Sequence, residues 1–243
     1  MKIVLIGRGR LATNLLPALQ RAGHDVVSID SRTLEGLPAE ADVFVVSVKD
    51  SALQEVVGRA VKGREGQLFV HTAGSMSMTL LQEQGAGRCG VFYPMQTFSK
   101  ERLVDFSEIA LFIEASDADS LLTLERLAAS LTTHVYRLTS DDRRYLHLAA
   151  VFACNFANHC YALAADMLQR HGLPFDVLLP LTDETARKVH QLPPRQAQTG
   201  PAVRYDENVI SMQHRLLSDQ PDVQAVYDLL SQSIHRIATE QKI

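Results

Sequence analysis

The stretch Lys2-Ile3-Val4-Leu5-Ile6-Gly7-Arg8-Gly9-Arg10-Leu11-Ala12 decides the fold. Its apolar first half is typical of a buried strand and opens directly onto the pattern G-x-G-x-x-A and a helix-compatible segment. Gly7 permits a tight turn, Gly9 lets the main chain approach a pyrophosphate, and Ala12 lets the helix pack closely against the sheet. With a second strand at 25–29, the pattern predicts a dinucleotide-binding βαβ unit. A structural glycine turn in another α/β protein is the alternative. The residues expected to hold the dinucleotide here are Gly7, Gly9, Arg10, Leu11 and Ala12.

The composition is that of an ordinary globular protein. The chain has 243 residues, of which 46% are hydrophobic and 21% charged. A net charge of −4 gives no electrostatic reason to expect nucleic acid or an anionic membrane as a partner. The longest apolar runs, such as 43–48, have strand length, and a strand begins where a secretory leader would stand. Cys89, Cys154 and Cys160 have no C-x-x-C spacing. We therefore expect a cytoplasmic protein with reduced thiols, no metal site, and neither a membrane nor a nucleic-acid partner.

Short apolar runs alternate with helical segments through the first part of the chain. Several runs are continuous in Val, Ile, Leu and Phe, which is typical of parallel strands covered on both faces. The alternation predicts a doubly wound sheet, with a connection too short for a full crossover helix between the second and third strands. The expected strands are 2–6, 25–29, 42–48, 67–72, 88–93, 109–114 and 134–138, and the expected helices between them are 11–22, 50–61, 78–84 and 117–131.

After Leu138 the pattern is helical only. Residues 141–170 read as one long helix that Gly172 and Pro174 end. Further helices are expected at 176–190, 206–217 and 222–239, with a loop rich in Pro and Gly over 191–203. The chain is therefore predicted to be an α/β protein. A doubly wound Rossmann sheet that binds NAD(P) occupies 1–138, and an all-α domain for substrate binding and dimerisation occupies 139–243.

The end of the second strand bears on the choice of dinucleotide. An acidic residue there accepts a hydrogen bond from the ribose 2′-hydroxyl of NAD, whereas an arginine accommodates the 2′-phosphate of NADP. Asp30 stands at the usual place of the acidic residue, while Ser31, Arg32 and Thr33 form a hydroxyl–guanidinium–hydroxyl cluster suited to phosphate. Asp30 would repel that phosphate unless its side chain turns away or pairs with a base. The residues favour NADP (as NADPH) slightly over NAD, and a solvated turn is the alternative for each of them.

Several segments together carry a resemblance to known proteins. They are GRGRLA (7–12), SR (31–32), VHTAGS (70–75), YPMQTF (93–98), HLAAVFACNF (147–156) and GPAVRYD (200–206), followed by His214. On these segments the chain resembles the superfamily of pyrroline-carboxylate reductase, 6-phosphogluconate dehydrogenase and ketopantoate reductase. Within it, the chain is most similar to Rossmann-like proteins with a C-terminal helical domain of unknown function. The resemblance covers essentially the whole chain. It implies a homodimer built on the helical domain and a Ser31–Arg32 pair that reads NADP, but no known substrate.

Three departures from that superfamily bear on the chemistry. Its hydroxyacid dehydrogenases and ketopantoate reductases protonate the nascent alkoxide with a lysine on the long interdomain helix, but residues 141–186 contain no lysine. The serine, glycine and proline signature of pyrroline-carboxylate reductases is also missing from that helix, which argues against proline synthesis. Relatives often have histidine where Tyr93 stands, which argues against a catalytic role for Tyr93.

In a doubly wound sheet the ligand lies beyond the carboxyl ends of the strands. The segments that follow the expected strand ends are Ser47–Lys49, His71–Ser75 and Tyr93–Thr97. We expect Val48 and Gly74 to contact the cofactor, because a glycine lets the backbone come close to a nicotinamide ring, and His71 to contact the substrate. Asp50 is expected to cap the helix that follows it. Whether Lys49 lies near the phosphates stays open.

The long helix carries the candidate catalytic residues. A step of about 100° per residue places Asn158, Asn155 and His159 about 20°, 80° and 120° from His147, on an otherwise apolar helix. Such a polar stripe is either a hydrogen-bonded seam between helices or subunits, or the wall of a cleft that faces the cofactor. In the second case His147 is the proton donor, and Asn155 orients a substrate carbonyl or imine.

The segment 200–206 combines a loop with the start of a helix. Asp206 is expected to cap that helix, and Arg204 either pairs with Asp206 or clamps a substrate carboxylate. His214 lies on the same side of this helix. It could complete the substrate site, from the partner subunit if the dimer is intertwined, or serve in packing.

Two classes of function remain open. The first is an NADP-dependent oxidoreductase that transfers hydride to a C=N or C=O group of a small, anionic metabolite at the interdomain cleft, with the cofactor supplying the redox chemistry. The second is a non-catalytic NADP-binding sensor or regulatory protein, which the missing lysine keeps open. We favour the oxidoreductase.

Overall fold

Residues 1–240 are described by a computed structural model, in which the chain divides into two compact units, Met1–Phe156 and Ala157–Ile243. The boundary predicted after Leu138 comes earlier in the sequence than this division. Helix α5 (Ser140–Ala150), which we assigned to the helical domain, belongs to the first unit. The reason is that Ser140 and Arg143 both donate hydrogen bonds to the Glu114 carboxylate of the sheet, at 2.6 Å and 2.7 Å.

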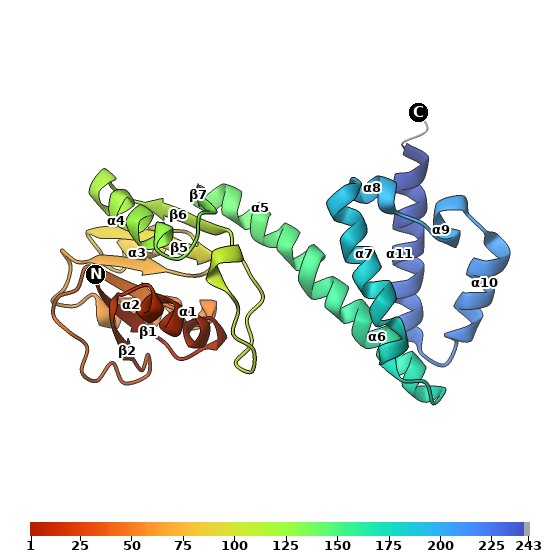
Figure 1. Ribbon diagram of the computed structural model, residues 1–243, viewed down its shortest axis with the longest axis horizontal. Coiled ribbons are helices and arrows are strands. Elements are labelled where there is room, and N and C mark those ends of the chain that lie inside the picture. The colour runs from red at the N-terminus through yellow and green to blue at the C-terminus, as the bar shows by residue number, and fades with distance from the viewer. Residues whose placement is uncertain (241–243) are drawn as a thin grey trace. The chain divides into compact units, whose positions relative to one another are not determined.

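The first unit is built on a seven-stranded sheet in the order β2-β1-β3-β4-β5-β6-β7 (Figure 1). Strands β1 to β5 are parallel, whereas β6 is antiparallel to β5 and β7 is parallel to β6. The sequence predicts all seven strands but not the reversal at β6, because a strand buried on both faces has the same apolar pattern in either direction. The strands are β1 (Lys2–Ile6), β2 (Asp25–Ile29), β3 (Val43–Val46), β4 (Leu68–His71), β5 (Arg88–Pro94), β6 (Leu111–Ala115) and β7 (Val135–Arg137).

A helical layer covers each face of this sheet. On one face, α1 (Arg10–Arg21) and α4 (Ala118–Ala129) pack with Ile3 and Leu5 in one apolar core. On the other face, α2 (Asp50–Ala60) and α3 (Thr79–Glu83) pack with Val4 and Ile6 in a second core. Successive strand residues point to opposite faces, so the unbroken apolar run of β1 supplies both cores. A short 3-10 helix, η1 (Phe106–Glu108), precedes β6. Residues 30–42, all of which the structure describes, contain no helix, as predicted for the short connection from β2 to β3.

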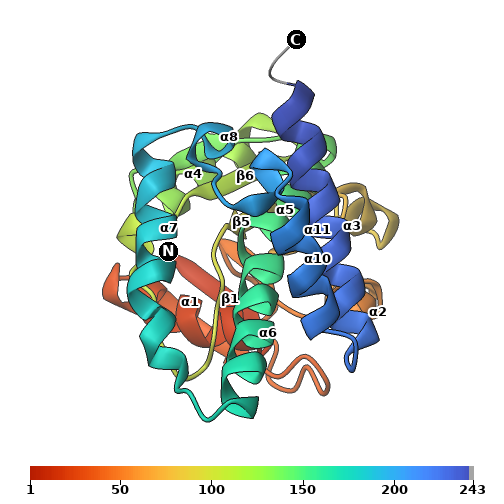
Figure 2. The same cartoon turned by 90° about the vertical axis from the view of Figure 1, so that its right-hand side faces the viewer.

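The second unit is helical throughout its described residues, 157–240. Helices α10 (Glu207–Leu216) and α11 (Pro221–Glu240) lie side by side (Figures 1 and 2). They are joined by an ion pair between His214 Nδ1 and Asp228 Oδ1, 2.9 Å apart, and by a hydrogen bond from Tyr227 to Gln213. The segment predicted as a loop contains two short helices, each with proline in its first turn, where the missing N–H has no cost. The other elements are α6 (Ala157–Arg170), η3 (Phe175–Leu178), α7 (Leu179–Gln191), α8 (Pro194–Ala197) and α9 (Pro201–Arg204).

A π-helical segment, η2 (Val151–Phe156), joins α5 to α6. Its wider turns change the angular step per residue, so the 100° step that related His147 to Asn155 does not hold across it. The whole helical run, Ser140–Arg170, is long and apolar enough to cross a membrane by length and composition, and its most apolar window has no buried residue. The prediction from the sequence rested on uninterrupted apolar runs and did not single out this helix.

Candidate functional site

A groove opens at the carboxyl ends of β1, β3 and β4 in the first unit. Strand β1 lies between β2 and β3, so the connections that leave the ends of β1 and β3 run to opposite sides and leave a crevice. The groove has a volume of about 1260 Å³. This is enough for a dinucleotide, since pockets for drug-sized ligands measure roughly 300–1,000 Å³. Of the predicted site residues, Gly9, Arg10, Leu11, Ser31, Arg32, Val48, Gly74 and His147 line it.

The first two motif glycines are needed for different reasons. Gly7 has a φ of +124°, and a Cβ there would lie 2.1 Å from the carbonyl oxygen of Ser47. The backbone at Ser47, directly after the neighbouring strand β3, therefore excludes a side chain at position 7. Gly9 has an ordinary φ of −75°, and a Cβ there would have nothing within 4 Å. Nothing within the described protein requires glycine at position 9, so the open space in front of it is a cradle that a Cβ would fill.

The start of α1 faces this cradle. Gly9 is the N-cap residue, and no side chain caps the helix. The first N–H groups of a helix lack intrahelical partners and carry the positive end of its dipole, so this end suits an anion. Arg10 and Leu11 follow along the groove. Ala12 does not line it but lies in the core between α1 and the sheet, where a small side chain permits close packing.

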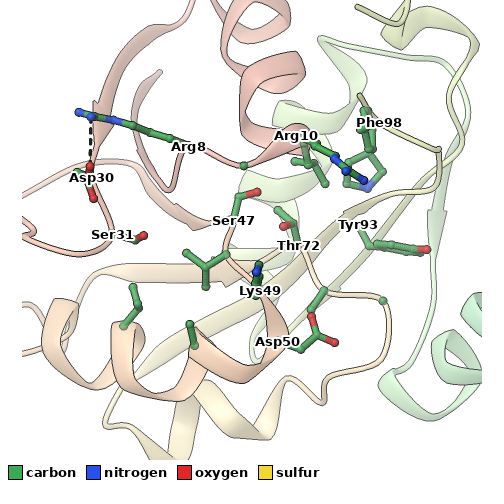
Figure 3. Close-up of a pocket in the computed structure, with 18 of the residues that line it drawn as sticks. Arg8, Arg10, Asp30, Ser31, Ser47, Lys49, Asp50, Thr72, Tyr93 and Phe98 are labelled. Atoms are coloured by element: carbon green, nitrogen blue, oxygen red, sulfur yellow. Dashed lines mark ion pairs between the residues drawn. The ribbon is translucent and has the colours of Figure 1, made fainter. Parts of the chain in front are cut away.

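Arg8, Asp30 and Ser31 lie together at one end of the groove (Figure 3), and Arg32 and Arg59 also line the groove. The guanidinium of Arg8 pairs with the Asp30 carboxylate at 3.2 Å, and Asp30 also accepts a hydrogen bond from the backbone N–H of Arg32 at 2.9 Å. Asp30 is therefore already engaged by a base and by the turn, which meets the condition for accommodating a phosphate beside it. Ser31 and Arg32 line the same end. The pairing of Arg8 with Asp30 was not predicted from the sequence, because the middle residue of the G-x-G pattern can be any residue type.

Arg59 of α2 holds the backbone of the turn at residues 32–33. Its guanidinium donates to the carbonyl oxygens of Arg32 and Thr33, at 2.9 Å and 3.4 Å. Thr33 itself is not among the lining residues, and its hydroxyl accepts from the N–H of Glu35 at 3.3 Å. The predicted contact of Thr33 with the cofactor is therefore replaced by a role in the turn.

Three residues from separate segments meet at the other end of the groove. The hydroxyl of Tyr93, at the end of β5, lies 3.1 Å from Nδ1 of His147 on α5. A Cβ added to Gly74 would lie 2.5 Å from that nitrogen and 3.0 Å from Cζ of Tyr93. Burial raises the pKa of Tyr93, so its phenol stays protonated at neutral pH. Tyr93 thus lies at the groove, in a segment that the sequence analysis placed beyond the strand ends.

His71 does not line the groove. Its side chain is fully buried, with Nε2 3.3 Å from the carbonyl oxygen of Ser77 and Nδ1 accepting from the N–H of Ala73 at 3.2 Å. Burial, and then the positive charge of Arg143, lower the pKa of His71 to about 4, so the ring is neutral. His71 therefore holds the loop that follows β4 from inside, and its contact with the substrate stays a prediction.

A buried ion pair anchors the helix that carries His147. Arg143 has no exposed surface, and its guanidinium lies 2.7 Å from the Glu114 carboxylate and also donates to the carbonyl oxygen of Met76. Because Arg143 precedes His147 by one helical turn, this pair sets the distance of His147 from the groove.

Asp50 does not cap α2, as the sequence led us to expect. Lys49 is the N-cap residue, and no side-chain capping bond is present. Asp50 is the first residue of the helix and instead accepts a hydrogen bond from the hydroxyl of Ser75. The carboxylate therefore links α2 to the loop that bears Gly74. Lys49 and Asp50 both line the groove (Figure 3).

The remaining predicted residues lie elsewhere. Asn155 is exposed within the π-helical segment and does not line the groove. Arg204 is exposed at the end of α9, and within residues 1–240 it forms no ion pair with Asp206, whose side chain makes no capping bond either. His214 pairs with Asp228 inside the second unit. No group of three metal-ligating side chains occurs in the described part of the chain.

One wall of the groove extends beyond the predicted segment Tyr93–Thr97. The loop after β5 brings Phe98 and Lys100 to the groove, and Asn14 of α1 holds this loop in place. The Asn14 amide donates to the carbonyl oxygen of Ser99 at 2.7 Å and accepts from the N–H of Val104 at 3.0 Å. An asparagine on the buried face of α1 was the sequence signal for this contact, since such a group needs partners.

Known proteins share this architecture. Residues 109–234 match the family model described as "Domain of unknown function (DUF2520)". The crystal structure of a "putative NADP oxidoreductase" from Bacteroides fragilis is 50% identical, covers 96% of this chain and 97% of that chain, and has a TM-score of 0.91. No functionally curated protein sequence matches this chain.

More distant structures share the fold alone. An imine reductase from Myxococcus stipitatus in complex with NADP+ is 18% identical, covers 99% of this chain and 95% of that chain, and has a TM-score of 0.67. A pyrroline carboxylate reductase from Plasmodium falciparum with NADP bound is 12% identical, covers 98% of each chain, and has a TM-score of 0.62. The family match spans more than half of the chain, and the resemblance inferred from the sequence motifs is confirmed. The chain belongs to the DUF2520 family, with a Rossmann NAD(P)-binding fold followed by a helical C-terminal region.

Proposed function

We propose that this protein is an NADP-dependent oxidoreductase that reduces a C=N or C=O group of a small, anionic metabolite. The observation that carries the proposal is the open cradle at Gly9, a glycine that the protein's own packing does not require. It stands at the uncapped start of α1, where a pyrophosphate would be held. The similarity to the putative NADP oxidoreductase from Bacteroides fragilis supports the same cofactor, and so does the NADP bound in the Myxococcus stipitatus and Plasmodium falciparum structures.

The groove residues fit NADP along its whole length. Gly9 and the following N–H groups would hold the pyrophosphate, and Ser31, Arg32 and Arg8 would hold the 2′-phosphate, because Asp30 is already paired. Val48 and Gly74 would border the nicotinamide. When bound, the cofactor supplies hydride.

The protein supplies the proton. His147 lines the groove beside Gly74, and histidine is the side chain most often used for general acid–base catalysis, so His147 is the donor in this proposal. Arg10, Lys49 and Lys100 also line the groove and form no ion pair within residues 1–240, which supports an anionic substrate. Asn155, Arg204 and His214 stay predicted substrate contacts that await a test.

Cofactor choice can be tested by binding. Arg32→Ala removes one charge-assisted contact with the 2′-phosphate, which is worth about 1.5–3 kcal/mol, or roughly 10- to 150-fold in Kd. We expect the Kd of NADPH, measured by fluorescence titration, to rise by this factor while that of NADH stays unchanged. Arg126→Ala, an exposed arginine on α4, is the matched control and should change neither. Equal weakening of NADPH and NADH by Arg32→Ala would refute the assignment of the 2′-phosphate site.

Activity can be tested with a panel of imines, keto acids and aldehydes, by following the loss of NADPH absorbance. We expect turnover of at least one class, abolished by His147→Gln with the Kd of NADPH unchanged. Activity retained in this variant would remove His147 as the donor. Tight NADPH binding with no oxidation across a broad panel would instead favour the sensor, which is the second candidate.

The proposal includes a homodimer. The long helix exposes four large apolar side chains: Tyr145 (76% exposed), Leu148 (53%), Phe152 (64%) and Phe156 (49%). The Phe152 and Phe156 rings contact edge to face, with their centroids 4.9 Å apart. These exposed apolar side chains lie within one helical run, and the contact between the Phe152 and Phe156 rings makes part of them a continuous apolar surface that a copy of the chain could cover. A dimer in the cytoplasm would cover this surface, and the three cysteines, all unpaired, suit a reducing compartment.

The dimer is tested by sedimentation velocity. Phe152→Arg should give a monomer, whereas Leu103→Arg, which changes a 53% exposed leucine on a loop of the first unit, should stay dimeric. A wild-type protein that is monomeric and cosediments with lipid vesicles would refute both the dimer and the absence of a membrane partner, since the helical run Ser140–Arg170 is apolar enough to span one.

A further inference from the structure

Tyr93 and His147 form a pair of which the proposed function uses only the histidine. The Tyr93 hydroxyl lies 3.1 Å from Nδ1 of His147. The two rings meet edge to face, with centroids 6.1 Å apart and planes at 73°. Both residues line the groove, and Figure 3 shows the Tyr93 ring extending from the end of β5 with its hydroxyl outermost. The contact joins β5 to α5 across 54 residues of sequence.

Gly74 leaves room for this pair. Gly74 is not among the glycines with positive φ, so its backbone conformation is open to other residues. A Cβ at this position would nevertheless lie 2.5 Å from Nδ1 of His147 and 3.0 Å from Cζ of Tyr93. Both distances are shorter than Cβ contacts normally are. The glycine is therefore explained by the neighbouring side chains, and the loop after β4 is shaped around the pair.

We propose that Tyr93 is a positioning residue that holds Nδ1 of His147, so that Nε2 is the atom that delivers the proton to the substrate. This inference rests on the proposed function, in which His147 is the proton donor. A phenol hydroxyl is both a donor and an acceptor. It accepts from Nδ1–H when the imidazole is protonated and donates to Nδ1 when that nitrogen is bare. Tyr93 thus holds the ring in one orientation through the whole catalytic cycle.

The proton step balances with this arrangement. The N–H bond at Nε2 breaks, and the proton forms a new bond with the nitrogen or oxygen of the substrate double bond, whose carbon takes the hydride. The imidazolium becomes neutral and regains a proton from water. A carboxylate in place of Tyr93 would stabilise the imidazolium and hold its proton back. Burial raises the pKa of Tyr93, so this partner stays uncharged.

The test removes the hydroxyl alone. Tyr93→Phe keeps the ring that packs against His147, and Tyr136→Phe is the matched control. Tyr136 lies on β7, is 49% exposed, and its hydroxyl makes no hydrogen bond within the described residues. We expect Tyr93→Phe to lower kcat roughly 10- to 100-fold, since a misdirected donor loses much of the benefit of orientation. KM and the Kd of NADPH should change less than about twofold. An unchanged kcat, or an equal loss in Tyr136→Phe, would overturn the proposal.

A second measurement needs no turnover. In ¹⁵N-labelled protein the ring nitrogens of His147, assigned by their disappearance in His147→Gln, report which nitrogen carries the proton. Tyr93→Phe should shift the balance of the two neutral tautomers, and Tyr136→Phe should not. Unchanged ring-nitrogen shifts in Tyr93→Phe would overturn the pair. Failure of NADPH to bind the wild type would overturn the proposed function instead, and the spectra of the free protein would still decide whether the pair exists.

Discussion

Replacing Gly9 by alanine separates a glycine that serves a ligand from one that serves the fold. The backbone of Gly9 has φ −75° and ψ −178°, which alanine adopts freely, and a Cβ there would meet no protein atom within 4 Å. The free energy of unfolding of Gly9→Ala should therefore change by no more than about 1 kcal/mol, because alanine restricts the unfolded chain but is a poorer N-cap residue than glycine.

The same methyl group should weaken the binding of NADPH strongly. A phosphate held by the first N–H groups of α1 must approach them to about 2.9 Å, and a Cβ on the N-cap residue stands in that approach. Loss of two charge-assisted hydrogen bonds, at about 1.5–3 kcal/mol each, would weaken NADPH by at least about 3 kcal/mol, or more than about 100-fold in Kd. Fluorescence titration with NADPH and urea unfolding measure the two quantities.

Gly7→Ala is the matched contrast. Its Cβ would lie 2.1 Å from the Ser47 carbonyl oxygen at a φ of +124°, and that backbone is fixed because the Ser47 N–H donates to Ile6 at 2.8 Å. We expect Gly7→Ala to lose more than about 3 kcal/mol of stability or to fail to fold. If Gly9→Ala binds NADPH like the wild type, the pyrophosphate does not lie at this cradle and the reasoning from the glycines is refuted.

Three further predictions concern side chains around the groove. Gly74→Ala should displace the His147 ring by about 1 Å. We expect this displacement to lower kcat roughly 100-fold with little change in melting temperature. A kcat near that of the wild type would contradict the crowding seen at this position. The pKa of His71 is about 4 in the folded protein, against an ordinary value of 6.5, so the folded state favours the neutral ring. Its contribution to the free energy of unfolding is therefore complete above about pH 6.5 and is lost as the pH falls towards 4. Urea unfolding should show a loss of about 3 kcal/mol over this window, and His71→Gln should flatten the dependence; an identical slope in the variant would assign it to other groups. Asn14→Ala should free the loop after β5 and lower the free energy of unfolding by about 1–3 kcal/mol. Trypsin should then cleave faster after Lys100, and an unchanged cleavage rate would show that other contacts hold the loop.

Where the sequence prediction failed, a distant partner was decisive. The first compact unit continues past Leu138 because the Arg143–Glu114 ion pair ties α5 to the sheet, and neither residue has a local signal for the other. Asp50 follows the pattern of a helix cap, yet its partner is the hydroxyl of Ser75, 25 residues away. A histidine at a strand end looks like a ligand, but His71 is buried by the loop that follows it. In each case the missing information was which segments the fold brings together.

The reversed strand and the π-helical segment illustrate a second limit. The apolar residues of β6 satisfy both faces of the sheet in either direction, so their pattern contains no information on polarity. The wider π-helical turns of Val151–Phe156 likewise have no signal in the residue pattern, and they remove the angular relation between His147 and Asn155 that a regular helix would keep.

The sequence by itself determined the alternation of strands and helices and the phosphate-binding turn, because these depend on interactions among residues a few positions apart. A strand, two glycines and a small residue define the backbone of the turn wherever they occur. Only the tertiary structure decided that Arg8 engages Asp30 and that Tyr93, Gly74 and His147 meet, since strand pairing and a buried ion pair bring these side chains together. Contact between residues 54 positions apart depends on the packing of the whole unit, and no local pattern contains it.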